Sequence, residues 1–165
     1  MTDINFTRKI PVKYNVDIFI AGGGPAGTAA AVTAANDGKK IFLAESHSCF
    51  GGMSTAGLIP IFMQFGDGVN FLADGFGRKV LNSLLEHGGT EKGDGHYPIH
   101  AETLKRVYDK LMTQSGADFS FYTKVIAVEK ANDKISTVIC AAKSGIFAVE
   151  ADIFIDCTGD GDMAV

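Results

Sequence analysis

The chain has 165 residues, and 15 lysines and arginines against 19 aspartates and glutamates give it a net charge of −4. This length fits one ordinary domain, and the mild acidity without a basic stripe makes nucleic acid a poor candidate partner. Residues 1–13 lack an apolar signal core, no run approaches the ~20 apolar residues of a membrane span, and the three cysteines form no C-x-x-C pair, so we expect a cytoplasmic protein with free thiols and no membrane contact.

The first strong pattern is a short apolar run over residues 16–21 that leads directly into three spaced glycines. Gly22, Gly24 and Gly27 have the G-x-G-x-x-G spacing of dinucleotide-binding folds. Gly22 lets the chain turn tightly out of the strand, Gly24 lets backbone approach a pyrophosphate, and Gly27 lets the following helix pack close to the sheet. Residues 1–15 are expected to be a lead-in with an edge strand near 10–12.

A helix is predicted from Pro25 to Asp37, ending before Gly38. Its first turn would aim free backbone N–H groups at phosphates, and Pro25 suits a position where no N–H is needed. A second parallel strand, residues 41–45, ends in Glu45, which lies 45 − 27 = 18 residues after Gly27. A carboxylate there accepts hydrogen bonds from ribose hydroxyls and repels a 2′-phosphate, which predicts the AMP half of NAD or FAD. The alternative is a glycine turn in an unrelated α/β protein with Glu45 merely solvated.

The middle of the chain carries less regular patterns. Residues 46–77 are predicted to be a long loop, followed by helices over 76–86 and 101–114 with a polar loop at 88–95 between them. We interpret 46–100 as a loop and helix insert that leads toward the substrate side. Its candidate substrate-facing residues are Asp94, His96, Tyr97 and His100.

From residue 118 onward the pattern predicts strands. Residues 125–131, 135–142 and 146–150 predict a three-stranded antiparallel meander, and 153–156 predicts one more buried parallel strand. The predicted fold class is therefore α/β, a Rossmann-like FAD/NAD(P)-binding fold whose parallel sheet with helices is interrupted by a β-meander crossover. Such an interruption separates flavin folds from simple NAD domains.

Three separated motifs together carry a family resemblance that spans nearly the whole chain. They are Gly22–Gly27 with Glu45, then Gly51-Gly52-Met53-Ser54-Thr55, then Asp156-Cys157-Thr158-Gly159-Asp160-Gly161-Asp162. The chain resembles the N-terminal, FAD-binding part of FAD-dependent oxidoreductases of the glutathione-reductase superfamily, in particular those related to fumarate reductase flavoproteins.

This resemblance implies roles for named residues. Backbone at Gly51, Gly52 and Met53 would pass close to the pyrophosphate and ribityl side of FAD. Asp160 would lie near the ribityl and phosphate region, with Thr158 and Gly159 on the adenosine side. Adenine would meet backbone at 124–126. The complete predicted cofactor-binding set is Gly22, Gly24, Pro25, Ala26, Gly27, Glu45, Ser46, Gly51, Gly52, Met53, Val125, Thr158, Gly159 and Asp160.

Departures from related flavoproteins narrow the chemistry. Residues 53–60 contain no cysteine, which excludes a dithiol mechanism at that place, and the surroundings of His47 do not match a covalent flavin site, so we expect noncovalent FAD. We expect hydride transfer to or from flavin N5, with a small-molecule substrate, no metal, and no catalytic acid or base identifiable from these residues.

We also expect the chain, residues 1–165, to be the N-terminal fragment of a longer enzyme, inactive alone, with exposed apolar surface covered by the remainder of the chain or by an oligomer partner. Three alternatives remain at this point: an NAD-dependent dehydrogenase domain, a dinucleotide-binding module without redox chemistry, and a flavoprotein that modifies tRNA. The late Thr-Gly-Asp motif disfavours the first, and the absence of a basic patch disfavours the third.

Overall fold

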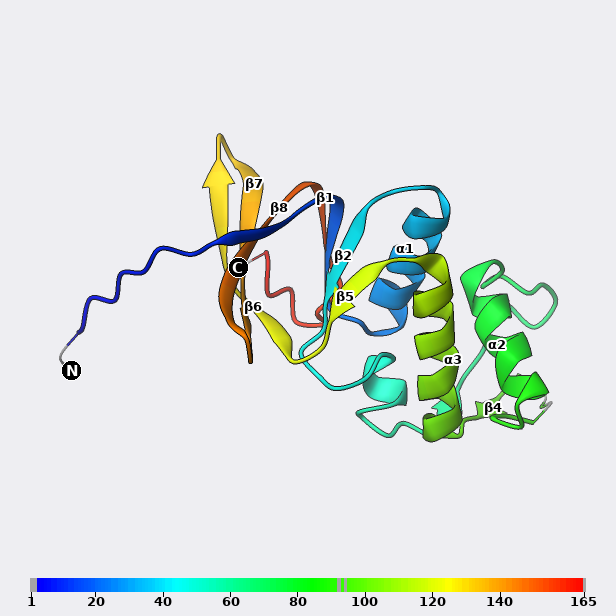
Figure 1. The fold of residues 1–165 in the computed structure, drawn as a ribbon. Coiled ribbons are helices and arrows are strands. Elements are labelled where there is room, and N and C mark those ends of the chain that lie inside the picture. The colour runs from blue at the N-terminus through cyan, green and yellow to red at the C-terminus, as the bar shows by residue number, and fades with distance from the viewer. Residues whose placement is uncertain (1–2, 92, 94, 165) are drawn as a thin grey trace.

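The computed structural model describes residues 3–91, 93 and 95–164, and these form a mixed α/β fold (Figure 1). The elements, in chain order, are β1 (Val12–Ala21), α1 (Pro25–Asn36), β2 (Ile41–Ala44), the short 3₁₀ turn η1 (Gly52–Ser54), β3 (Ile61–Phe62), α2 (Phe76–Glu86), β4 (Tyr97–Pro98), α3 (Ala101–Ser115), β5 (Asp118–Ser120), β6 (Thr123–Ala131), β7 (Lys134–Ala142) and β8 (Gly145–Asp156).

One six-stranded sheet organises the fold, with strand order β5-β2-β1-β8-β7-β6. The first four of these strands pair in parallel, and β8-β7-β6 pair antiparallel. Numbered by their place in the chain, the parallel strands have the order 3-2-1-4, which is the arrangement of a Rossmann-like nucleotide-binding half. The predicted fold class, including the antiparallel meander, is therefore confirmed.

The two faces of the parallel strands are buried in different ways, because alternate side chains point to opposite faces of a strand. Ile18 and Ile20 of β1 belong to the core beneath α1, α2 and α3. Phe19 belongs to a second core, in which the meander curls over the sheet. With both faces covered, the last four residues of β1 and all four of β2 are apolar and buried, as their sequence pattern predicted.

The last strand differs from the sequence-based expectation. Residues 146–150 and 153–156 form one continuous strand, β8, whose first half pairs with β7 while most of its length, from Ala148 onward, pairs with β1. The expected burial at 153–156 is also wrong, since Ile153 is 53% exposed. The edge strand expected near residues 10–12 is absent from the described residues, because β1 itself begins at Val12.

The hairpin between β6 and β7 turns through two residues with left-handed backbone. Asn132 has φ 51° and Asp133 has φ 62°. Two successive positive φ values define the turn whose twist matches that of paired strands, and Asn and Asp tolerate it better than other non-glycine residues. The tip projects from the sheet, far from the helices (Figure 1).

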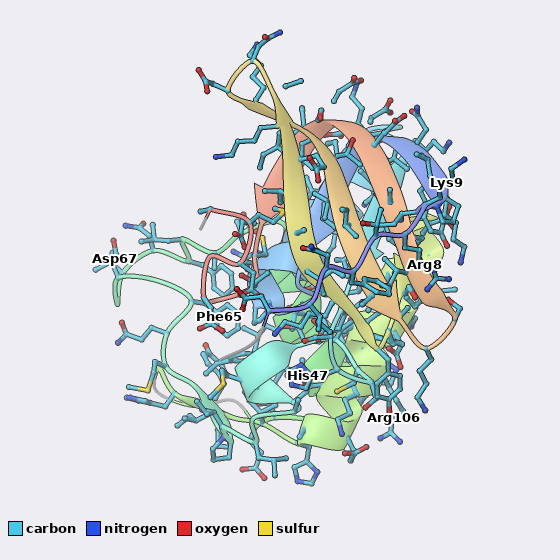
Figure 2. The ribbon with its side chains drawn as sticks, turned by 90° about the vertical axis from the view of Figure 1, so that its left-hand side faces the viewer. Arg8, Lys9, His47, Phe65, Asp67 and Arg106 are labelled. Carbon is cyan, nitrogen blue, oxygen red and sulfur yellow. The ribbon has the colours of Figure 1, made fainter. Side chains whose placement is uncertain are left out.

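The predicted long loop contains structure of its own. Within 46–77 lie η1 and β3, and β3 pairs with β4 in a two-residue antiparallel ribbon. Phe65 stacks against Phe71 and meets Tyr97 edge-on, with ring centroids 5.5 and 5.4 Å apart. Phe65 and Asp67 lie on a loop that projects from the body of the domain (Figure 2). Aromatic contacts therefore order a segment that shows no periodicity.

We predict that Phe42→Ala lowers the free energy of unfolding by about 3–5 kcal/mol, because it removes a fully buried ring from the sheet centre. The ring lies 3.9 Å, centroid to centroid, from that of Tyr14. Denaturant unfolding would measure the loss. Ile153→Ala, at a half-exposed position of β8, is the matched control and should cost less than about 1 kcal/mol. Equal losses for the two variants would contradict this account of the core.

Candidate functional site

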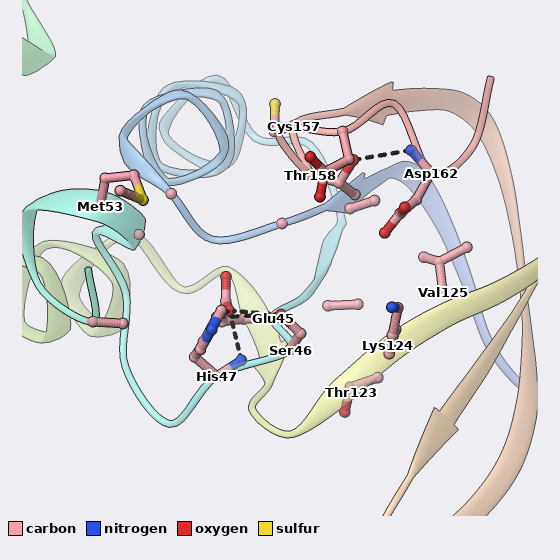
Figure 3. Close-up of a pocket in the computed structure, with 18 of the residues that line it drawn as sticks. Glu45, Ser46, His47, Met53, Thr123, Lys124, Val125, Cys157, Thr158 and Asp162 are labelled. Carbon is pink, nitrogen blue, oxygen red and sulfur yellow. Dashed lines mark hydrogen bonds and ion pairs between the residues drawn. The ribbon is translucent and has the colours of Figure 1, made fainter. Parts of the chain in front are cut away.

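The carboxyl ends of three neighbouring strands are level with one another. In the sheet register, Ala21 at the end of β1 lies opposite Ala44 of β2 on one side and Asp156 of β8 on the other. The turns that follow these strands therefore meet at one edge, the usual ligand position in open α/β sheets. A cleft of about 690 Å³ lies there (Figure 3). Gly24, Gly52 and Gly159, one from each glycine motif, all line it.

The first glycine turn is packed so tightly that two of its glycines admit no side chain. Gly22 has φ 90°, and a Cβ there would collide with the carbonyl oxygen of Cys157. A Cβ at Gly27 would collide with the carbonyl oxygen of Gly22. Gly24 is different, since a Cβ placed on it meets no atom of the described residues within 4 Å. The protein itself therefore leaves the space beside Gly24 open.

Gly24 is also the residue that begins α1, and no side chain from the described residues caps this helix. The first N–H groups of a helix have no partner within the helix, and the helix dipole places partial positive charge at this end. An uncapped N-terminus at the rim of a cleft is suited to an anionic group such as a phosphate.

The second glycine turn packs directly on the first. The amide of Gly51 donates to the carbonyl oxygen of Gly23 at 2.9 Å. Gly52 has φ 51° and lies so close that a Cβ on it would be 3.3 Å from Gly24 Cα. The Thr55 hydroxyl, fully buried, donates to the carbonyl oxygen of Phe50 at 2.6 Å and so braces the turn from within.

Glu45 occupies the position predicted for the ribose-binding acid, at the end of β2 and on the wall of the cleft. Its residue is only 4% exposed. One carboxylate oxygen accepts the Gly23 amide at 2.5 Å, and the other accepts the His47 amide at 2.6 Å and His47 Nδ1 at 2.9 Å. Glu45 therefore also braces the glycine turn, a role that its spacing alone did not indicate.

The third turn is held by a side chain that sequence reasoning missed. The Asp156 carboxylate accepts the Thr158 hydroxyl and amide at 2.8 and 3.0 Å and the Met163 amide at 2.9 Å. The Thr158 hydroxyl in turn accepts the amides of Gly161 and Asp162 at 3.1 and 3.0 Å. Asp156 and Thr158 thus shape the loop, which leaves Gly159 and Asp160 exposed on the cleft side.

The remaining wall comes from the start of β6. Thr123, Lys124 and Val125 line the cleft, whereas Ile126, predicted with the last two, does not. The amide of Thr123 donates to the Glu45 carbonyl oxygen at 2.9 Å, which ties this wall to the end of β2. Among the described lining residues Lys124 is the one lysine or arginine, so the backbone supplies most of the donors suited to phosphate.

The predicted set is therefore largely gathered in one place. Ten of its residues line the cleft: Gly22, Gly24, Glu45, Ser46, Gly52, Met53, Val125, Thr158, Gly159 and Asp160. Four that do not line it, Pro25, Ala26, Gly27 and Gly51, belong to the same turns and shape them. Lining residues outside the set are Ala21, Ala44, His47, Ala56, Gly57, Thr123, Lys124, Cys157 and Asp162. Most of these lie next to a residue of one of the motifs, and that proximity in sequence is the signal by which they could have been found.

Cys157, the described cysteine that lines the cleft, offers no thiolate there. Burial, together with the charge of Asp156, raises the pKa of the Cys157 thiol, which keeps it protonated at neutral pH. Burial raises the pKa of Cys140 to about 12. All three cysteines are free, and Cys49 is partly rather than fully buried.

The loop candidates for the substrate side lie away from this cleft. His96, Tyr97 and His100 are not among the residues that line it, and Asp94 lies outside the described residues. Within the described part of the chain, no group of three or more His, Cys, Asp or Glu side chains is placed to hold a metal ion. No described helix is both long and apolar enough to cross a membrane.

Comparison with known families decides the identity of the fold. The profile of the FAD dependent oxidoreductase family matches residues 17–165. The chain belongs to this family. FAD is therefore its cofactor, and the resemblance inferred from the three motifs is confirmed. No curated protein sequence matches the chain significantly.

Solved structures share the fold at low identity. A geranylgeranyl bacteriochlorophyll reductase-like protein (Ta0516) from Thermoplasma acidophilum is 18% identical, with TM-score 0.61 over 87% of this chain and 39% of that one. THI4 from Thermovibrio ammonificans is 16% identical, with TM-score 0.63 over 91% and 60%. The myxobacterial chondrochloren halogenase CndH, a variant of FAD-dependent halogenases, is 17% identical, with TM-score 0.60 over 88% and 37%. The chain thus spans about two fifths to three fifths of these proteins.

The geometry of the cleft fits FAD independently of the family match. The open space beside Gly24 is one that a side chain would fill, and it adjoins the uncapped N-terminus of α1. Glu45 and the start of β6 line the same cleft. A pyrophosphate, a ribose and an adenine each find the kind of partner they require.

The late turn should respond to acid. Burial by itself raises the pKa of Asp156, but hydrogen bonds from Thr158 and Met163 outweigh it and hold the pKa below the ordinary aspartate value. A depressed pKa in the folded state stabilises the turn above the unfolded-state pKa, and this stabilisation is lost as the pH falls through the folded-state pKa. We predict that the amide NMR signals of Thr158 and Met163 titrate together, with a midpoint below that of an ordinary aspartate.

Asp156→Asn should abolish this joint titration, whereas Asp162→Asn should leave it unchanged. A midpoint at or above the ordinary aspartate value would contradict the hydrogen-bonded arrangement of the turn.

Proposed function

We propose that this chain is the FAD-binding part of an oxidoreductase and holds the cofactor noncovalently in the cleft at the carboxyl edge of the sheet. The convergence of the three glycine turns on one cleft carries this proposal. When bound, FAD supplies hydride transfer through flavin N5. The substrate is a small molecule bound outside this cleft, and the relation of this chain to a longer enzyme and its cytoplasmic location stay predictions from the sequence.

Each part of the cleft has a distinct task in this proposal. The uncapped N-terminus of α1 and the backbone beside Gly24 and Gly52 bind the pyrophosphate through N–H groups. Glu45 accepts a hydrogen bond from the adenosine ribose, and the start of β6 lies against the adenine. The turn at Thr158–Asp160 closes the remaining side. No residue of this chain is assigned as the catalytic acid or base.

The apolar surface expected from the sequence has candidates near the cleft. Met53, Leu58, Ile59 and Met63 belong to the segment from η1 to just after β3 and are between 44% and 68% exposed, and Met53 also lines the cleft. That a further part of the enzyme covers these side chains remains a proposal.

The direct test is the ligand that the purified protein carries. Flavin absorption in the native protein and its complete release as FAD on denaturation would support noncovalent FAD binding. Flavin that stays with the denatured chain would contradict the noncovalent mode. Bound NAD instead, or bound FAD that no donor reduces in the intact enzyme, would support the dehydrogenase or the non-redox module, which the family membership disfavours.

We predict that Gly24→Val abolishes FAD binding without loss of stability. The φ of −65° at Gly24 suits any residue, and the protein leaves its side open, so the added methyl groups would occupy only the space meant for a phosphate. FAD titration and thermal melting would measure the two effects. Thr33→Val, on the exposed face of the same helix, is the size-matched control. Unchanged affinity in Gly24→Val would refute the pyrophosphate assignment.

We further predict that Glu45→Ala weakens FAD binding by about 1–3 kcal/mol, because a charged acceptor is lost from the ribose. The same variant should lower the melting temperature of the protein without ligand, since the Gly23 amide loses its buried partner. Calorimetric titration would separate the two effects. A stability loss with unchanged affinity would mean that Glu45 only braces the turn.

A further inference from the structure

The carboxylate of Glu45 is held by the histidine that follows it two residues later. His47 donates its backbone amide to Oε1 at 2.6 Å, and its Nδ1 lies 2.9 Å from the same oxygen. A carboxylate accepts hydrogen bonds and donates none, so Nδ1 must carry the hydrogen of this contact. His47 thus donates two hydrogen bonds to Oε1 of Glu45, one from its backbone amide and one from its ring.

The two carboxylate oxygens are consequently unequal. A carboxylate offers about four acceptor positions in total. Oε1 receives both His47 donors and lies 3.3 Å from the Ser46 hydroxyl, whereas Oε2 receives the Gly23 amide. Among the described residues, the spare acceptor capacity therefore lies on Oε2. Where that capacity points depends on the rotation of the carboxylate, which the Gly23 amide on Oε2 and the amide and ring of His47 on Oε1 hold together.

The backbone that carries the ring is held by pairing with the start of β6 and the residue before it. The amide of Tyr122 donates to the His47 carbonyl oxygen at 3.0 Å, and that of Thr123 donates to the Glu45 carbonyl oxygen at 2.9 Å. The His47 side chain is 63% exposed and lines the cleft, beside Glu45 (Figure 3). An ordinary surface histidine would be equally exposed, but its partner would not be a carboxylate whose side chain is 5% exposed.

We propose that His47 is a positioning residue for the cofactor. Through Nδ1–H it holds Glu45 so that Oε2 accepts one hydroxyl of the adenosine ribose. This inference rests on the proposed function, since it assigns FAD to the cleft. It adds a specificity residue that acts through Glu45 rather than by forming its own bond to the cofactor.

Three substitutions test the role of Nδ1. His47→Ala removes the ring donor and should weaken FAD binding about tenfold. His47→Asn places an amide N–H where Nδ1 lies and should restore affinity to within about twofold of wild type. His47→Gln places its amide farther out, near the position of Nε2, and should behave like the alanine variant. Titration of the protein with FAD, followed by flavin fluorescence, gives each dissociation constant.

A double-mutant cycle with Glu45 tests whether the effect travels through the carboxylate. In the Glu45→Ala background, His47→Ala should cause no further loss of affinity. The matched control is His87→Ala, because His87 is also exposed but its Nδ1 contacts a carbonyl oxygen of α2, that of Ser83, at 2.8 Å, and its carboxylate neighbour, Glu86, is exposed and lies 3.9 Å away. This control should bind FAD like wild type.

Four results would overturn the inference. They are unchanged affinity in His47→Ala, equal losses in the asparagine and glutamine variants, additive losses in the cycle, and equal loss in the His87 control. Melting temperatures without FAD show whether a loss reflects unfolding, and the asparagine variant decides the matter if the alanine variant unfolds. A wild-type protein that fails to bind FAD overturns the proposed function and this inference together, which distinguishes the two failures.

Discussion

A single residue, Gly23, joins the first glycine turn to two later parts of the chain through its two backbone polar groups. Its N–H is bound by the carboxylate of Glu45 at the end of β2, and its carbonyl oxygen is bound by the amide of Gly51 in the second glycine turn. The residue is buried, so both polar groups need partners within the protein. This pairing fixes the first turn between β2 and η1 without any contact from a ligand. The cleft is consequently held by contacts within the protein, which would reduce the ordering cost of binding a ligand there.

The sheet register brings the turns after β1, β2 and β8 to the same edge of the sheet. β1 is the central strand, and its register with β2 and β8 ends all three strands at the same edge. Helices cover one face and the meander covers the other, so the edge is the part of the parallel strands left for a ligand. The residues that line the cleft therefore lie mostly on turns, and the two hydrophobic cores hold the strands that carry these turns.

The sequence predicted the parts of this arrangement that depend on local rules. Helix α2 was predicted with its observed bounds, because its apolar residues recur at helical spacing. The close packing expected at Gly22 and Gly27 is also present, since a Cβ at either position would collide with backbone. One feature of the fold escaped prediction for a physical reason. The continuity of β8 depends on pairing with β1, more than 130 residues earlier, and nothing local marks Glu150 and Ala151 as uninterrupted strand.

The site shows the same division. Spacing placed Glu45 at the cleft, but its bonds to Gly23 and His47 arise from a turn geometry that spacing does not encode. Asp156 was read as part of a motif, whereas its function in the structure is to hold the loop that follows. A residue that shapes a site by hydrogen bonding to other residues is harder to recognise in a single sequence than a glycine at a position where a Cβ would collide.

The hairpin of β6 and β7 has a practical consequence for work on this fold. Its tip, at Asn132 and Asp133, projects beyond the sheet, while the cleft is reached only by the opposite end of β6. A peptide epitope or a fluorescent label inserted at that tip would extend the two arms without moving the nucleotide-binding turns. The same insertion within β8 would shift Thr158 relative to Gly22. The hairpin is therefore the natural attachment point for a reporter that leaves the cofactor undisturbed.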